Sequence, residues 1–95
     1  MFHCNGWCFT WGTALVAGTN VCLRKISAET IYQALSENDV THLCGAPIVM
    51  QMIVNAEESE RRTFSQNVEI MTAAAPPPAA ILARMAEQGI RVTHV

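Results

Sequence analysis

The sequence has 95 residues, 51% of them hydrophobic and 15% charged, and six basic against eight acidic side chains give a net charge of −2. This composition excludes a disordered chain, which needs few apolar residues and a high net charge, and it excludes a basic nucleic-acid-binding surface. The length allows one domain or part of one, and no apolar run is long enough to span a membrane.

The first part of the chain predicts one helix and one strand. Residues 7–17 are apolar and include the small residues Gly12 and Ala14, which predicts a helix packed closely against a neighbour. The turn signal at residues 18–20 precedes a short apolar run at 21–23, which predicts a buried strand.

The middle of the chain predicts a helix, a strand and a second helix. Ser27 and Glu29 are typical of an N-cap and a first helical turn, so we expect a helix that ends near Asn38. The apolar run at residues 42–44 predicts a strand, and Pro47 suits the first turn of an apolar helix that reaches residue 54.

The last part continues the alternation. The charge run at residues 57–62 predicts a solvated loop, and residues 68–71 predict a third strand. Three prolines at 76–78 end that strand and open a helix, which Gly89 ends, and residues 90–95 predict a fourth strand. Alternating helices and short apolar strands predict an α/β fold with a parallel open sheet covered by helices on both faces.

Two expectations concern the protein as a whole. Because residue 95 lies inside a predicted strand, we expect residues 1–95 to be an internal piece of a larger domain. The cysteines at 4, 8, 22 and 44 are typical of buried free thiols in a reducing compartment, and the N-terminus lacks the basic region of a signal peptide. We therefore expect a cytoplasmic protein.

Two segments are candidates for chemistry. Ligands of such sheets bind at the carboxyl ends of the strands, where residues 72–78 combine small residues with prolines and leave the backbone open to a flat ring; a plain strand-to-helix turn is the alternative. Near the N-terminus, His3, Cys4 and Cys8 lack the fourth ligand of a zinc site and the acid partner of a Cys–His nucleophile. A purely structural role is the alternative for both aromatic residues: a hydrogen-bonded His3 and a Trp7 packed in the core.

Taken together, two stretches are diagnostic. Met-Phe-His-Cys-Asn-Gly-Trp-Cys at residues 1–8 and Met-Thr-Ala-Ala-Ala-Pro-Pro-Pro at 71–78 closely resemble the adenylate-forming acyl-CoA synthetases, in their medium-chain fatty acid and plant acyl-activating branch. The stretches at 18–24 and 40–47 fit the same family, so the resemblance covers nearly the whole chain.

The resemblance implies an AMP-forming acid–thiol ligase that uses a carboxylic acid, ATP and coenzyme A, with Mg²⁺. It places His3, Asn5 and Trp7 at the acyl pocket. The ATP-binding loop, whose backbone packs on adenine, corresponds to Ala73, Ala74, Ala75 and Pro76, although the family usually has a glycine at position 73 or 74.

The resemblance also implies that most of the machinery lies elsewhere in the same ligase chain. The phosphate loop, the Tyr-Gly-x-Thr-Glu motif and the C-terminal lid do not occur in residues 1–95, so these residues contain no catalytic or metal-binding residue of the family. We therefore expect the 95-residue chain alone to be inactive. A small stand-alone α/β domain that binds a nucleotide or a partner without catalysis is the alternative, and a peroxisomal location is open for a plant protein.

Overall fold

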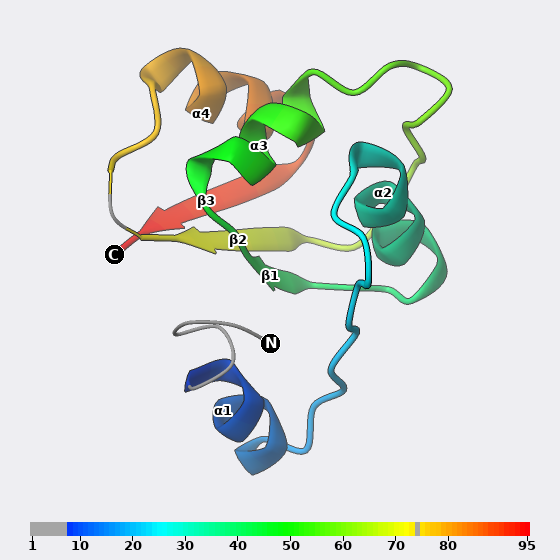
Figure 1. Ribbon diagram of the computed structural model, residues 1–95, viewed down its shortest axis with the longest axis vertical. Helices are drawn as coiled ribbons and strands as arrows, with labels where there is room; N and C mark the ends of the chain where they lie inside the picture. The colour runs from blue at the N-terminus through cyan, green and yellow to red at the C-terminus, as the bar shows by residue number, and fades with distance from the viewer. Residues whose placement is uncertain (1–7, 74) are drawn as a thin grey trace.

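A computed structural model describes residues 8–73 and 75–95 as four helices and three strands (Figure 1). The helices are α1 (Thr10–Leu15), α2 (Ala28–Glu37), α3 (Pro47–Val54) and α4 (Ala79–Glu87), and the strands are β1 (His42–Cys44), β2 (Val68–Thr72) and β3 (Ile90–His94). The strands form one parallel sheet in the order β1-β2-β3. The predicted α/β class, with a parallel sheet flanked by helices, is confirmed.

The connections β1-α3-β2 and β2-α4-β3 place α3 and α4 on the same face of the sheet, whereas α1 lies beyond the opposite face (Figure 1). Successive strands advance in one direction across the sheet, so right-handed crossovers bring both helices to one side. Along β2, Val68, Ile70 and Thr72 are buried and alternate with the half-buried Glu69 and Met71. The first three side chains therefore face α3 and α4, and the other two face α1.

One hydrophobic core lies between the sheet and helices α2, α3 and α4. Its fully buried side chains come from five elements, and they include Leu35, Met50, Ile53, Ile70, Met85 and Ile90. Every residue of the core cluster lies between positions 28 and 90. We call residues 27–95 the α/β unit.

Local signals in the sequence explain how the α/β unit is built. Ser27 caps α2, where its Oγ accepts from the backbone N–H of Thr30 at 3.3 Å and the Thr30 hydroxyl bonds back to the Ser27 N–H at 3.2 Å. The Tyr32 hydroxyl donates to the carbonyl of Ile53 at 3.2 Å and lies 2.7 Å from Oε1 of Gln88. These bonds fix α2 against α3 and the end of α4.

Residues 8–26, which we call the arm, differ from the prediction. Helix α1 confirms that a helix lies within residues 7–17, but it covers only Thr10–Leu15 and buries none of its residues, so the predicted close packing is wrong. The predicted strand at 21–23 is also wrong, because these residues form an exposed loop. An apolar run becomes a buried strand only where a neighbouring strand pairs with it, and the described residues offer it none.

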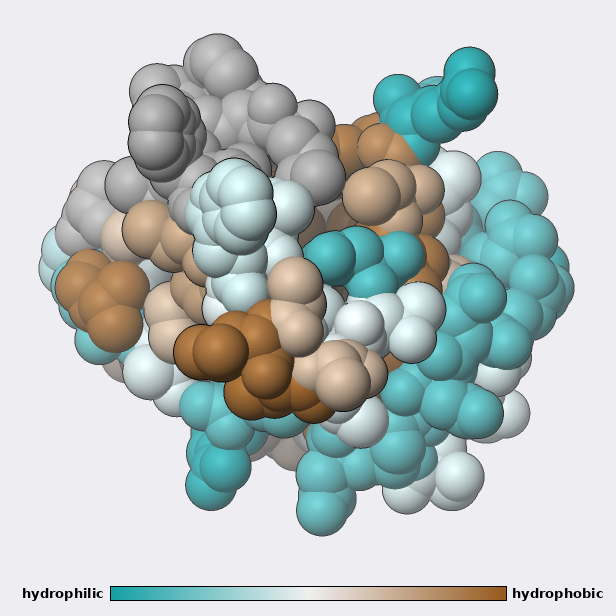
Figure 2. Space-filling model, turned by 90° about the horizontal axis from the view of Figure 1, so that it is seen from below, coloured by the Kyte–Doolittle hydropathy of each residue, from teal (hydrophilic) through white to brown (hydrophobic). Residues whose placement is uncertain are grey.

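The surface of the arm is unusually apolar. Trp11, Leu15, Val16 and Ile26 are each more than half exposed. Figure 2, viewed from the side of α1, shows apolar surface gathered on this face. Within the part of the chain that the structure describes, no helix is long and apolar enough to cross a membrane.

The prediction that the cysteine thiols are buried also differs from the structure. Cys8, Cys22 and Cys44 carry free thiols, but Cys8 and Cys22 are exposed on the arm rather than buried, and only Cys44 of β1 is half-buried. Cys4 lies outside the described residues. The burial expected for the thiols followed from the predicted packing of the arm, and it fails for the same reason.

Candidate functional site

The carboxyl ends of the three strands meet at one edge of the sheet, and backbone hydrogen bonds join the segments that leave it. The N–H of Gly45, just after β1, donates to the carbonyl of Met71 at 3.1 Å. The N–H of Val95, just after β3, donates to the carbonyl of Thr72 at 2.9 Å. This edge, where ligands of parallel sheets bind, is therefore a single continuous surface.

The loop at residues 73–78 leaves this edge directly after β2. Ala73, Ala75 and Pro76 are exposed, and Pro77 is buried, while Ala74 lies outside the described residues. The structure thus places the described residues of the loop at the carboxyl end of a parallel strand, and Ala73, Ala75 and Pro76 are exposed there. Among the described non-glycine residues, positive φ occurs only at Ala17 and Asp39, so alanine at position 73 is not strained.

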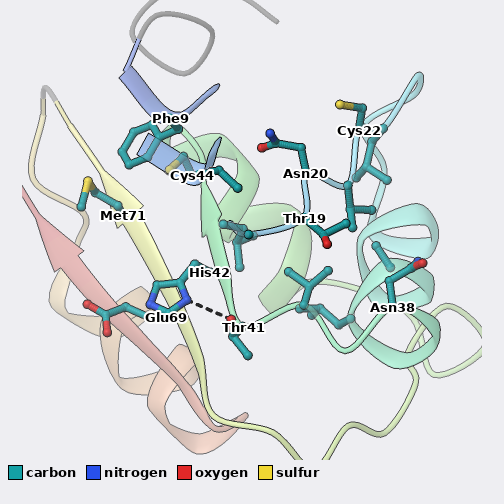
Figure 3. A pocket seen from close by; sticks show the side chains of 18 of the residues that line it. Phe9, Thr19, Asn20, Cys22, Asn38, Thr41, His42, Cys44, Glu69 and Met71 are labelled. Atoms are coloured by element: carbon teal, nitrogen blue, oxygen red, sulfur yellow. Dashed lines mark hydrogen bonds between the residues drawn. The ribbon is translucent and has the colours of Figure 1, made fainter. Parts of the chain in front are cut away.

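A cavity of about 990 Å³ lies beside this edge, between the arm, the end of α2 and the sheet face that points away from α3 and α4. Figure 3 shows its two ends. Phe9 of the arm, Cys44 of β1 and Met71 of β2 line the cavity at an apolar end next to the carboxyl edge. Toward the amino ends of the strands, His42 and Glu69 line a polar end.

A hydrogen-bonded carboxylate organises the polar end. Glu69 accepts from the Thr93 hydroxyl at 2.6 Å and from Nη2 of Arg91 at 2.8 Å. The Thr93 hydrogen bond, followed by that of Arg91, lowers the pKa of the Glu69 carboxyl, and the nearby His42 acts in the same direction. Glu69 is therefore held as a carboxylate that Arg91 balances in charge, so the polar end carries an ion pair.

The apolar end has the opposite character. Burial raises the pKa of the Cys44 thiol, so this thiol stays protonated at neutral pH. A protonated thiol, a thioether and a phenyl ring present a surface suited to hydrocarbon. The cavity can therefore take an apolar group at the end nearest the carboxyl ends of β1 and β2.

The arginines of the α/β unit are engaged in structural bonds away from the loop. Arg84 donates to the Asn55 side chain at 3.0 Å and to the Val54 carbonyl, which Arg61 also contacts at 3.2 Å. Arg62 pairs with Glu37 at 3.1 Å. Across residues 8–73 and 75–95, no group of three or more His, Cys, Asp or Glu side chains could hold a metal ion.

The predicted acyl-pocket residues His3, Asn5 and Trp7 lie outside the described residues, so their placement stays a prediction. Sequence reasoning missed the cavity residues Phe9 and Cys44, which belong to different segments and share no linear pattern. For Glu69 and Met71 a signal was present, because alternate residues of one strand face the same side.

The sequence profile of the AMP-binding enzyme family matches residues 1–95. An acetate–CoA ligase of Humulus lupulus is 48% identical over 95 residues, and a 2-methylpropanoate–CoA ligase of the same plant is 51% identical over 94 residues. Both alignments cover 99% of this chain, but only 17% and 16% of the relative. The chain thus spans about a sixth of the length of these curated relatives.

Two further similarities add to these. An acetate/butyrate–CoA ligase of Arabidopsis thaliana, peroxisomal by its name, is 45% identical over 95 residues, which are 99% of this chain and 17% of that protein. The N-terminal domain of FACL13 from Mycobacterium tuberculosis superposes with a TM-score of 0.88 at 19% identity, over 99% of this chain and 24% of that one. At such low identity this likeness bears on the fold alone.

Proposed function

Because the chain belongs to the AMP-binding enzyme family, we propose that it forms part of an AMP-forming acid–thiol ligase that joins a carboxylic acid to coenzyme A. In the first step, the carboxylate oxygen of the acid attacks the α-phosphorus of ATP, and pyrophosphate leaves with the electrons of the broken P–O bond. In the second step, the coenzyme A thiol loses its proton and attacks the acyl carbon, and AMP leaves.

The contribution proposed for these residues is binding rather than charge stabilisation. Ala73, Ala74, Ala75 and Pro76 present their backbone to the adenine ring, and the exposed position of the loop at the carboxyl edge is the observation that carries this proposal. A flat ring packs closely only where no large side chain intervenes, and the loop offers small side chains and prolines.

The acid is proposed to bind in the neighbouring cavity. Its apolar end, at Phe9, Cys44 and Met71, suits a fatty or aromatic acyl group, and His3, Asn5 and Trp7 are proposed to complete the pocket. Met71 lies in β2 one residue before its last residue Thr72, which the loop at 73–78 follows, so the proposed acyl pocket and the proposed adenine surface share one edge of the sheet. Names of similar proteins point to short acids such as acetate and 2-methylpropanoate.

Magnesium belongs to the chemistry that the family implies, but the described residues do not fit it, because they contain no cluster of carboxylates or other ligands. The transition state gathers negative charge on the phosphates, which demands cations and hydrogen-bond donors held in place. In our proposal the remainder of the same ligase chain supplies them, at a cytoplasmic or peroxisomal location.

The proposed function is tested with the complete ligase that contains residues 1–95. The enzyme is incubated with ATP, Mg²⁺, coenzyme A and one acid from a series of short, branched, medium-chain and aromatic acids. Acid-dependent formation of AMP, pyrophosphate and an acyl-CoA thioester is expected. Failure with every acid of the series would contradict the proposal.

The 95-residue chain alone provides the matched control. We expect no pyrophosphate release above background, because four of its six cationic side chains make structural bonds and none of these bonds lies at the loop. Acid-dependent pyrophosphate release by a monodisperse preparation of this chain would show that residues 1–95 hold the catalytic groups.

A further inference from the structure

The hydroxyl of Thr72 is the one buried side-chain group that has no hydrogen-bond partner among the described residues. Thr72 is only 2% exposed. It is the last residue of β2, and its side chain faces α3 and α4 together with those of Val68 and Ile70. The next residue, Ala73, begins the loop proposed to contact adenine.

A hydroxyl in this position needs a partner. Valine has nearly the same shape as threonine and would fill the site without burying a polar atom, whereas an unpaired hydroxyl destabilises the folded state. Buried polar groups in native proteins are nearly always bonded, and ordered water serves where no protein group is in reach. The unpaired Thr72 hydroxyl therefore points to an ordered water that is bound beside the end of β2.

The same edge of the sheet offers further hydrogen-bonding groups for such a water. Helices α3 and α4 both begin there, and their N-cap residues, Ala46 and Pro78, provide no side-chain cap. The first backbone N–H groups of each helix have no partner inside the helix. The run Pro76-Pro77-Pro78 adds carbonyls but no N–H donors. Donors and acceptors for such a water therefore belong to the segment that follows Thr72 and leads into α4.

We propose that Thr72 is a positioning residue for nucleotide binding, whose hydroxyl holds a buried water that also bonds to the backbone between β2 and the first turn of α4. This link fixes the backbone at Ala73 and Ala75 relative to the sheet, and so sets the surface on which adenine packs. The inference rests on the proposed function, because it assumes that this loop contacts adenine.

The test uses the complete ligase with Thr72→Val and Thr72→Ser, and with Thr63→Val as a control at an exposed threonine of the same unit. Thr72→Val should lower the melting temperature and raise KM for ATP about five-fold, the effect of losing one hydrogen bond, with KM for the acid unchanged. Thr72→Ser should keep both values within about two-fold of the parent, since it retains the hydroxyl. Thr63→Val should match the parent enzyme.

Several results would overturn the inference. A higher melting temperature for Thr72→Val would mean that the hydroxyl is unpaired in the complete enzyme, and a lower one with unchanged KM for ATP would mean that it serves folding alone. A crystal structure of the complete enzyme with no water on the Thr72 Oγ1 would refute the proposed link directly.

Calorimetry with AMP distinguishes a failure of the proposed function from a failure of the inference about Thr72. If the parent enzyme binds AMP but forms no thioester, the proposed reaction is wrong, and Thr72→Val must still weaken AMP binding about five-fold for the inference to hold. If the parent enzyme binds no AMP, the loop does not contact adenine, and the positioning role falls with it.

Discussion

The arm and the α/β unit are built from similar proportions of apolar residues, yet only one of them has a core. In the α/β unit Leu35 is 1% exposed, whereas in the arm Leu15 is 87% exposed. The difference lies in packing: the apolar segments of the unit bury against the sheet and its helices, whereas α1 of the arm lies beyond the opposite face of the sheet and buries none of its residues. Apolar sequence is thus necessary for a core but needs a neighbouring surface.

The largest expected effect separates two leucines. Leu35→Ala should lower the free energy of unfolding by about 2–5 kcal/mol, because it leaves a cavity in the core. Leu15→Ala should change it by no more than about 0.5 kcal/mol, since the side chain is exposed. Urea denaturation of both variants beside the parent chain measures the contrast. Equal losses would mean that the arm is packed in solution.

Two glycines sharpen the comparison. An added Cβ at Gly45, after β1, would lie 2.9 Å from the Cβ of Val49, whereas at Gly12 of α1 it would meet nothing within 4 Å. Gly45→Ala should therefore destabilise the fold by about 1–3 kcal/mol through overpacking.

Gly12→Ala should instead be neutral or favour α1 by up to about 1 kcal/mol. Thermal unfolding of the two variants gives both signs. The double variant Gly45→Ala/Val49→Ala should recover part of the stability that Gly45→Ala loses. If it recovers none, the loss has a cause other than the contact with Val49.

A smaller effect concerns the stability of the fold at acidic pH. The pKa of Glu69 lies below its ordinary value of 4.5 in the folded state, through the Thr93 hydrogen bond first and Arg91 second. Its stabilising contribution is therefore complete above about pH 4.5 and is lost as the pH falls through the lowered pKa. Urea midpoints measured between about pH 3 and 6 should fall less steeply in Glu69→Gln than in the parent.

Thr93→Val should flatten the same profile in part, because it removes the larger cause of the shift. If Thr93→Val leaves the slope of the parent unchanged, the hydrogen bond does not hold the carboxylate.

The smallest expected effect changes reactivity and not stability. Cys22 of the arm is exposed, whereas Cys44 is half-buried and burial raises the pKa of its thiol. Iodoacetamide at neutral pH should modify Cys22 well before Cys44, as followed by peptide mass spectrometry. In urea the two rates should converge. Faster labelling of Cys44 in the folded chain would contradict its protection by the sheet.

The sequence predicted the α/β unit well because its signals are local. Ser27 and Pro47 mark helix starts, and Gly89 adopts the positive φ of 77° expected just after a helix. It failed for residues 21–23, whose burial depends on a partner strand. The carboxyl edge and the loop at 73–78 were predictable from the alternation of strands and helices.

Other features of the site depend on packing. The cavity joins Phe9, Cys44 and Met71 from three segments, and no spacing along the chain reveals that they meet. The unpaired hydroxyl of Thr72 is equally invisible in sequence, because threonine in a strand is common and only the surrounding atoms decide whether it has a partner.

The order β1-β2-β3 of the strands also bears on how the sheet assembles during synthesis. Among the described residues each strand pairs with its nearest neighbour in sequence, as His42 with Glu69 and Val68 with Ile90. These pairings close only short loops. As residues leave the ribosome, β2 can pair with β1 before α4 has been translated. Strand β3 then adds to the edge of a β1-β2 pair that has already formed.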